Sequence, residues 1–218
     1  MNIQTEVTNF IDQDVSMRRG LSRGYINTRS LAKYIHDNLN ISTSLDAIIS
    51  AIRRYQTKEE SKEDIKTRYK YIASAKVSSR TRMASVLFRK EMDVRKSLIN
   101  LYNKIDFSKG DVLRILEVGQ FLKIIIDEDN LKLLEGIFDE HDIISYDKKL
   151  GEVSLIYDRD VIETPGIFAA LGSELAQNNI SIRDGVICGS EHVFILKEDD
   201  VMKALQVLYK ITKWGEKN

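Results

Sequence analysis

The stretch IIIDEDNL at residues 124–131 recurs as FILKEDDV at residues 194–201, which lies 70 positions later in the chain. In both places an apolar run leads through an acidic turn into an apolar helix start. A second pair supports this spacing, because SVLF at 85–88 resembles SLIY at 154–157, an offset of 69 positions. Two matching segments at nearly one offset indicate an internal duplication.

Each copy alternates strands with helices. The first copy predicts a strand at 83–88, a helix at 94–105, a hairpin at 112–118 and 121–126, a helix at 131–138 and a short strand at 143–146. The second predicts strands at 153–157, 180–182 and 193–196 and helices at 168–175 and 201–208, and it leaves only residues 211–214 for a last strand. The order β-α-β-β-α-β is that of the ferredoxin-like split βαβ fold.

The N-terminal region has the apolar periodicity of helices and contains no proline. A first helical stripe is followed by a basic turn at 18–24, and a break is expected at 38–40. The expected helix caps are Asn27 or Thr28 and Ser42 or Thr43. We therefore predict an α+β protein with a helical, helix-turn-helix-like domain at 1–76 and two ferredoxin-like units at 77–149 and 150–218.

The net charge of zero hides an uneven distribution. The chain has 33 basic and 33 acidic side chains, but residues 1–110 hold 21 basic and 12 acidic ones and residues 111–218 hold 12 and 21. Such a division suggests two parts with different partners. Residues 1–76 hold 13 basic and 9 acidic side chains, so their excess of positive charge is a weak argument for DNA binding.

Several functional classes find no support in the sequence. Hydrophobic residues make up 43% and charged residues 30%, which excludes a mainly disordered chain. With one cysteine and three dispersed histidines, we expect no disulfide, no metal site and no cofactor. No apolar run is long enough to span a membrane, and the N-terminus does not resemble a signal peptide, so a cytoplasmic location is expected. No phosphate-binding, dinucleotide-binding or nucleophile motif is present, and we expect no catalytic residues and no enzyme activity.

Two smaller features receive structural interpretations. The acidic runs 127–129 and 198–200 precede predicted helices in both copies, which favours helix capping and interaction with the helix dipole over metal binding. Cys188 has no histidine or asparagine partner near it in the sequence, so we expect it to be a small buried side chain.

The sharpest local signal is ETPGI at 163–167, which contains the only proline of the chain. Thr164 can cap a helix, Pro165 suits its first position, and Gly166 lets a ligand approach the main chain closely. A helix N-terminus offers N–H groups to a carboxylate. The same residues also suit an ordinary helix start, so the local pattern leaves both interpretations open.

Residues 153–210 resemble an ACT domain of the aspartokinase type. The resemblance rests on ETPGIF at 163–168, NNISI at 178–182 and SEHVFI at 190–195. The whole chain resembles a group of archaeal regulators of amino-acid metabolism in which a DNA-binding-like helical region, matched here by residues 27–55, precedes ACT-type sequence. In this comparison the first unit, 77–149, is a degenerate ACT-like unit without the Pro-Gly loop, for which we expect a structural or pairing role.

The resemblance implies that an amino acid binds at an interface between domains, held mainly by main-chain groups. Carried over by position, the contacts are Thr164, Gly166, Ile167 and Phe168 in the first loop, and Asn179, Ser181 and Ile182 in the second strand, with Ser190 as a further contact. The residues Arg183-Asp184-Gly185 depart from the family pattern and leave the side-chain pocket open to question.

The helical region offers a second candidate surface. In a helix-turn-helix, residues 42–55 would form the recognition helix, and the expected DNA-contacting residues are Arg29, Thr43, Ser50, Arg53 and Arg54. An ordinary three-helix bundle with solvated Arg and Lys fits the same pattern, and Asp46 would lie unfavourably near phosphates.

Our leading hypothesis is a homodimeric regulator that binds an amino acid through its ACT-like region and double-stranded DNA through its N-terminal helices. The alternative is a regulatory subunit whose helical region binds a biosynthetic enzyme instead of DNA. A third possibility, an enzyme of amino-acid metabolism, would require a catalytic cluster that the sequence does not contain.

Overall fold

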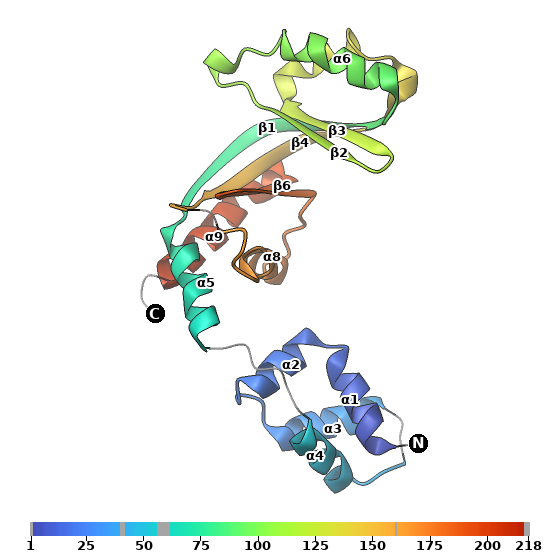
Figure 1. Ribbon diagram of the computed structural model, residues 1–218, viewed down its shortest axis with the longest axis vertical. Coiled ribbons are helices and arrows are strands. Elements are labelled where there is room, and N and C mark those ends of the chain that lie inside the picture. The colour runs from blue at the N-terminus through green and yellow to red at the C-terminus, as the bar shows by residue number, and fades with distance from the viewer. Residues whose placement is uncertain (1, 40–41, 56–61, 160, 216–218) are drawn as a thin grey trace. The chain divides into compact units, whose positions relative to one another are not determined.

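Figure 1 shows the computed structural model, which describes residues 2–39, 42–55, 62–159 and 161–215. Of residues 62–64 and 214–215 only the helical backbone is described. The chain divides into two compact units, Met1–Ile65 and Lys66–Asn218.

The first unit is helical in its described part. Its helices are α1 (Ile3–Asp12), α2 (Val15–Ser22), α3 (Thr28–Asn38) and α4 (Leu45–Arg54). Its core is apolar and consists of Val7, Ile11, Leu31, Ala32, Ile35, Ile48, Ala51 and Ile52. These residues repeat at helical spacing, so α1, α3 and α4 each bury one stripe against the others. The helix α2 packs against this core through the partly buried Met17 and Leu21.

Two N-terminal expectations need correction. The basic turn predicted at 18–24 is wrong, because α2 continues through Ser22. Asn27 does cap α3, since its side chain accepts hydrogen bonds from the main-chain N–H groups of Arg29 and Ser30. The cap of α4 is Ser44 rather than Ser42 or Thr43. A break was predicted at 38–40. The helix α3 ends at Asn38, as expected, and residue 40 lies outside the described residues.

The second unit begins in α5 (Lys62–Ser74), which crosses the boundary between the two units and leads directly into a mixed α/β fold. The strands are β1 (Lys76–Arg89), β2 (Leu113–Val118), β3 (Phe121–Asp127), β4 (Ile143–Ile156), β5 (Asp184–Cys188) and β6 (Glu191–Lys197). The helices between and after them are α6 (Met92–Tyr102), α7 (Leu131–Glu135), α8 (Ile167–Gln177) and α9 (Val201–Gly215). All six strands form one antiparallel sheet in the order β2-β3-β1-β4-β6-β5.

The two 14-residue strands β1 and β4 join the two copies of the repeat. The C-terminal part of β1 pairs with β3 from Met83 to Arg89, and the C-terminal part of β4 pairs with β6 from Leu150 to Ile156. The N-terminal part of β1, residues 76–80, pairs with the C-terminal part of β4. It therefore occupies the position that a last strand of the second copy would have filled.

Bulges bend both long strands near their centres. The pairing of β1 with β4 shifts between Arg80 and Met83 and again between Met83 and Ser85, and Arg82 and Lys149 have positive φ values of 58° and 54°. Residues of the acidic runs contact the strand at this bend. Arg80 contacts Asp127 at 3.2 Å, Arg82 contacts Asp129 at 2.6 Å, and the main-chain N–H of Arg82 donates to Glu198. The predicted capping role is wrong for these three carboxylates.

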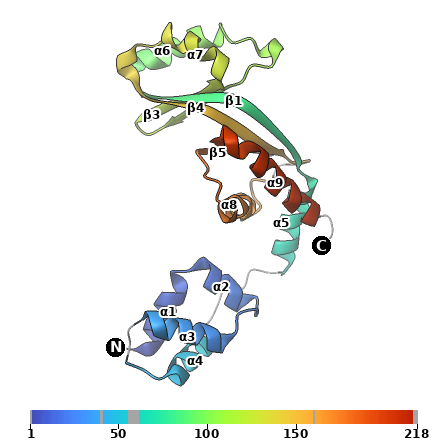
Figure 2. The same cartoon turned by 180° about the vertical axis from the view of Figure 1, so that it is seen from behind.

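Helices cover only one face of each half of the sheet, as Figure 2 shows with α6 and α7 at one end and α8 and α9 at the other. The helix-free faces pack against each other through Met83, Ile125, Leu150, Val193 and Ile195. Two ion pairs cross this layer, with Arg114 donating to Glu152 at 3.0 and 3.1 Å and Lys123 donating to Asp184 at 2.8 and 3.0 Å. The sheet is therefore curled around a central core, in addition to the two cores between its outer faces and the helices.

The mixed α/β class with an antiparallel sheet is confirmed, but several details differ from expectation. The boundary predicted between 149 and 150 falls inside β4. Residues 180–182 form a loop, and the strand begins at Asp184. The strand expected at 211–214 is wrong because α9 continues to Gly215. Cys188 is exposed rather than buried.

Candidate functional site

The loop before α8 has a conformation that depends on glycine. Gly166 occupies the N-cap position with φ of 83° and ψ of 5°, in the left-handed region, and no side chain caps the helix. Thr164 therefore does not cap α8 as predicted, and its main-chain N–H donates to Val161 in a turn before the helix. The first turn of α8, from Ile167 onward, consequently presents main-chain N–H groups that have no acceptor within the helix.

A buried arginine covers this loop. Arg68 of α5 is only 5% exposed, and its Nε donates to the main-chain oxygen of Pro165 at 2.8 Å. A Cβ atom built on Gly166 would lie 2.9 Å from Arg68 Nε and 3.1 Å from Nη2. The guanidinium thus packs against Gly166, a contact that only glycine permits.

The loop combines two sources of positive potential. The N-terminus of α8 carries a partial positive charge from the aligned peptide dipoles, and the Arg68 guanidinium adds a full charge beside it. Both favour an anionic group, and a planar guanidinium matches the geometry of a carboxylate. The arrangement therefore suits the binding of an anion.

Aromatic side chains form the layer beneath the loop. The Phe168 ring stacks on Phe194 with centroids 4.9 Å apart, and a Cβ atom on Gly185 would lie 2.6 Å from it. His192 is 2% exposed and its Nδ1 lies 3.1 Å from the Tyr157 hydroxyl. Burial lowers the pKa of His192 and raises the pKa of Tyr157, so both side chains are neutral near pH 7. Ile167 and Phe168 therefore contribute side chains to the core, and only their main chain is available to a ligand.

The predicted ligand residues divide into two groups. The first group lies at the N-terminal end of α8 and consists of Thr164, Gly166, Ile167 and Phe168. Ser190 lies before β6, and its main-chain oxygen accepts a hydrogen bond from the main-chain N–H of Tyr157, which follows β4. Asn179, Ser181 and Ile182 follow the C-terminal end of α8. An 11-residue helix is about 16 Å long, so these groups do not form one site within a single chain.

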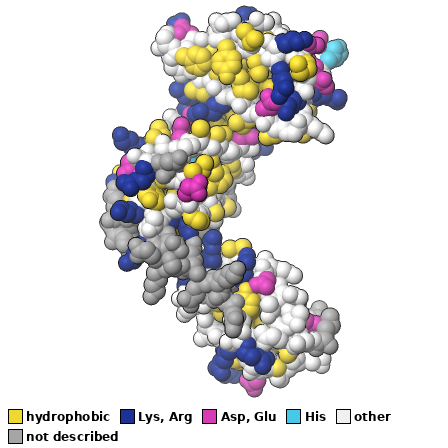
Figure 3. Space-filling model, viewed as in Figure 1, with side chains coloured by type: hydrophobic (Ala, Val, Ile, Leu, Met, Phe, Trp, Pro, Cys, Tyr) yellow, Lys and Arg dark blue, Asp and Glu magenta, His cyan; other side chains and the backbone are white. Residues whose placement is uncertain are grey.

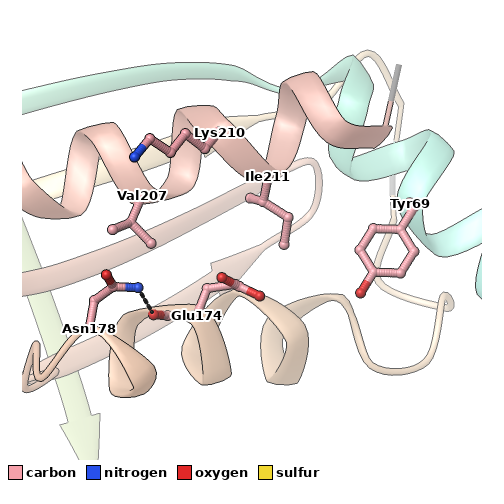
Figure 4. Close-up of a pocket in the computed structure, with 6 residues that line it drawn as sticks. All are labelled: Tyr69, Glu174, Asn178, Val207, Lys210 and Ile211. Carbon is pink, nitrogen blue, oxygen red and sulfur yellow. Dashed lines mark hydrogen bonds between the residues drawn. The ribbon is translucent and has the colours of Figure 1, made fainter. Parts of the chain in front are cut away.

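A separate pocket of about 480 Å³ lies between α8 and α9. Figure 4 shows six described residues that line it, with Glu174 on α8, Asn178 directly after α8, Val207, Lys210 and Ile211 on α9, and Tyr69 on α5. Glu174 points toward Tyr69, and Lys210 extends along α9 over Val207 (Figure 4).

The residues predicted to contact DNA lie in the first unit. Arg29 is exposed in α3, and Ser50 and Arg53 are exposed in α4. Thr43 precedes α4 and is half-buried. The exposed Arg54 donates from Nε to the Gln4 side chain at 3.0 Å, which directs it toward α1. Six residues separate α3 from α4, more than the three or four typical of a helix-turn-helix.

Sequence reasoning missed Arg68 and the pocket. The many charged residues of the stretch 58–70 are typical of a solvated helix face. Residues 58–61 lie outside the described residues, but Arg68 is buried. A signal was present, because Arg68 falls three residues after Ile65 and four before Ile72, on the apolar stripe of the helix. The pocket depends on the packing of three helices, which no local pattern reports.

Within the described parts of the chain, no three His, Cys, Asp or Glu side chains come together to form a metal site. None of the helices described has both the length and the apolar composition needed to cross a membrane.

Comparison with known proteins gives matches in structure alone. No family model matches the sequence, and a search of curated proteins gives no match. The regulatory subunit of aspartate kinase from Thermus thermophilus has a TM-score of 0.50 at 14% identity, covering 63% of this chain and 98% of the subunit. The subunit from Thermus flavus has the same TM-score and identity over 62% and 95%. Aspartate kinase from Clostridium acetobutylicum has a TM-score of 0.51 at 15% identity, covering 62% of this chain and only 34% of the enzyme. Part of the chain thus has a fold similar to that of the two regulatory subunits of aspartate kinase.

Proposed function

We propose that this protein is an amino-acid-sensing regulator that acts in the cytoplasm and has no catalytic role. The observation that carries the proposal is the glycine loop at the N-terminus of α8, with a buried arginine against it, in a fold similar to aspartate kinase regulatory subunits. The Clostridium acetobutylicum enzyme that matches in structure is described as allosteric.

The effector's carboxylate binds at the first turn of α8 beside Arg68. Main-chain N–H groups from Ile167 onward and the guanidinium together stabilise one negative charge. Its amine and side chain reach residues such as Asn179, Ser181 and Ile182 of a second copy, since within one chain these lie at the far end of α8.

Arg68 connects this site with the rest of the chain. It belongs to α5, which crosses into the first unit at Ile65. A ligand that binds one arrangement of Arg68 more tightly than another shifts the balance between them by that difference in affinity. The signal therefore passes from the loop to α5 and from there to the helical unit.

A thermal unfolding screen of the full chain with each of the twenty amino acids tests the proposal. Binding to the native state raises the unfolding temperature by several degrees at saturating ligand. If none of the twenty raises it, the sensing function is wrong.

For the first unit we propose binding to double-stranded DNA, through Arg29, Thr43, Ser50, Arg53 and Arg54. The exposure of Arg29, Ser50 and Arg53 supports this, since cations that contact phosphates must be accessible. Affinity for random duplex should fall steeply with salt and weaken in Arg29→Gln and Arg53→Gln, whereas Arg183→Gln, on the second unit, should have no effect.

The alternative is a regulatory subunit whose helical unit binds a biosynthetic enzyme instead of DNA. The second unit offers a further apolar surface to such a partner on α6, where Met92, Ile99 and Tyr102 are 64%, 68% and 52% exposed, and Figure 3 shows hydrophobic side chains gathered over this helix. Absence of duplex binding even at low salt would reject DNA and leave this alternative.

We further propose a homodimer. Strands β2 and β5 form the outer edges of the sheet, and residues 143–148 of β4 lie beyond the segment that pairs with β6. Unpaired strand edges favour pairing with a second copy. Sedimentation should give a mass of twice 25.0 kDa, and a concentration-independent mass of 25.0 kDa would contradict this.

A further inference from the structure

The pocket between α8 and α9 has the size and shape of a small-molecule site. Its volume of about 480 Å³ is within the range of ligand pockets, roughly 300–1,000 Å³. Glu174 follows Gly166 by eight residues, about 12 Å along α8, so the pocket is distinct from the glycine loop.

Opposite charges line the pocket from different helices. The half-buried carboxylate of Glu174 comes from α8, and the exposed ammonium of Lys210 comes from α9. Neither side chain forms an ion pair with any described residue, although both line the pocket. In Figure 4 the Glu174 carboxylate points toward Tyr69 and the Lys210 ammonium extends toward Val207, so the two charges lie toward different ends of the pocket. A partly desolvated carboxylate without a cation is unfavourable, and a bound cationic group would relieve this.

The remaining lining residues provide apolar and aromatic contacts for a ligand. Ile211, which is 7% exposed, and Val207 supply an apolar floor. The hydroxyl end of Tyr69 points toward Glu174 in Figure 4, so an ammonium beside Glu174 would also lie near an aromatic ring. Asn178 donates from Nδ2 to the main-chain oxygen of Glu174 at 2.9 Å, which fixes the far end of the pocket.

We infer that this pocket is a second binding site, which takes a small zwitterion with one ammonium and one carboxylate group. The ammonium lies between Glu174 and the Tyr69 ring, the carboxylate pairs with Lys210, and the carbon chain covers Val207 and Ile211. Tyr69 follows Arg68 directly on α5, so the same helix contacts both sites. The inference rests on the pocket alone and stands whether or not the glycine loop binds an effector.

The test is a two-dimensional ¹H–¹⁵N NMR titration of the full chain. The probes are glycine, 4-aminobutanoate and 6-aminohexanoate, which carry the same two charges at increasing separation. Butylamine and butanoate carry one charge each and serve as probe controls. We expect at least one zwitterion to shift the amide signals of residues 174–178 and 207–211 saturably, and each single-charge probe to bind at least about tenfold more weakly.

Charge variants assign the effect to the pocket. Glu174→Gln and Lys210→Gln should each weaken the zwitterion about tenfold or more, because each removes one charge-assisted contact. Glu135→Gln and Lys132→Gln make the same changes on exposed positions of α7 and should leave the affinity unchanged. The inference is overturned if no probe shifts the pocket signals, if shifts occur only at residues 166–169, or if the pocket variants bind like wild type.

Discussion

Two glycines in and before α8 have opposite structural requirements. Gly166 has a φ of 83° and packs against the Arg68 guanidinium, whereas Gly172 lies within the helix, where a Cβ atom would meet Ile182 at an ordinary 3.8 Å. Alanine is disfavoured in the left-handed region but stabilises helix interiors relative to glycine.

We predict that Gly166→Ala lowers the free energy of unfolding by roughly 1–2 kcal/mol and that Gly172→Ala raises it by up to about 1 kcal/mol. Urea titration of the full chain measures both. Equal effects of the two substitutions would show that the loop conformation is not as described.

The buried Arg68 predicts a stability effect that an exposed arginine would not have. Arg68→Met keeps much of the apolar stem but leaves the Pro165 carbonyl without its donor, so the free energy of unfolding should fall by about 1–3 kcal/mol. Arg183→Met, at an exposed side chain, is the matched control and should change it by less than about 0.5 kcal/mol.

His192 predicts a pH dependence of stability. Its folded pKa is below the ordinary value of 6.5, so below pH 6.5 the unfolded chain binds more protons at this position than the folded chain does. The stability it contributes is present above pH 6.5 and is lost as pH falls toward its folded pKa.

The free energy of unfolding in urea should therefore drop more between about pH 7.5 and about pH 5.5 in wild type than in His192→Gln. His141→Gln, at an exposed histidine, should retain the wild-type drop. Identical drops in all three proteins would show that His192 is not buried as a neutral side chain.

At the scale of elements, the shared strands β1 and β4 make the two halves of the sheet interdependent. Leu150 lies in the central core between the helix-free faces and is 1% exposed. Leu150→Ala should lower the free energy of unfolding by about 2–5 kcal/mol. Because the core belongs to both halves, hydrogen exchange should speed up equally in β3 and β6.

Ile99→Ala is the control, because this side chain on α6 is 68% exposed. It should leave the rate of hydrogen exchange unchanged in both β3 and β6. Faster exchange in β6 alone after Leu150→Ala would show that the second copy unfolds as a separate domain.

The repeat was visible in the sequence, but its register was not. The sequence match aligns residues 85–88 with residues 154–157. In the sheet, Val86 pairs with Ile124, and Val153 pairs with Phe194, the residue that matches Ile124 in the repeat. The strand pairing therefore makes Val153 the equivalent of Val86. That is an offset of 67 rather than 69 positions. A slip of two residues keeps every side chain on the same face of a strand, so the apolar pattern cannot detect it. The apolar pattern predicts most strands and helices, because it reports which residues face the core. It does not predict that both halves share β1, because this depends on long-range strand pairing.

At the scale of the whole molecule, some basic side chains from the first half of the sequence form ion pairs with acidic side chains from the second half. Arg80 and Arg82 come from the basic half of the sequence and pair with Asp127 and Asp129 from the acidic half. Lys90 and Arg95 likewise pair with Glu117. These four basic side chains therefore pair within the second unit, and their part of the basic excess gives no information about partners.

The candidate site was only partly predictable. The glycine loop was visible because Gly166 and the single proline mark a local conformation. Arg68 lies 97 positions away in sequence from the carbonyl that it contacts, and only packing of α5 on the second unit brings them together. Conversely, α8 separates the predicted group Asn179, Ser181 and Ile182 from the loop, which a linear pattern could not show.

The central claim is that the glycine loop and Arg68 bind an amino acid, and isothermal titration calorimetry of the full chain tests it most directly. We predict saturable binding of at least one of the twenty amino acids, weakened about tenfold or more in Arg68→Met and unchanged in Arg183→Met. No binding by any of the twenty, or equal affinity in the wild type and in Arg68→Met, would contradict the claim.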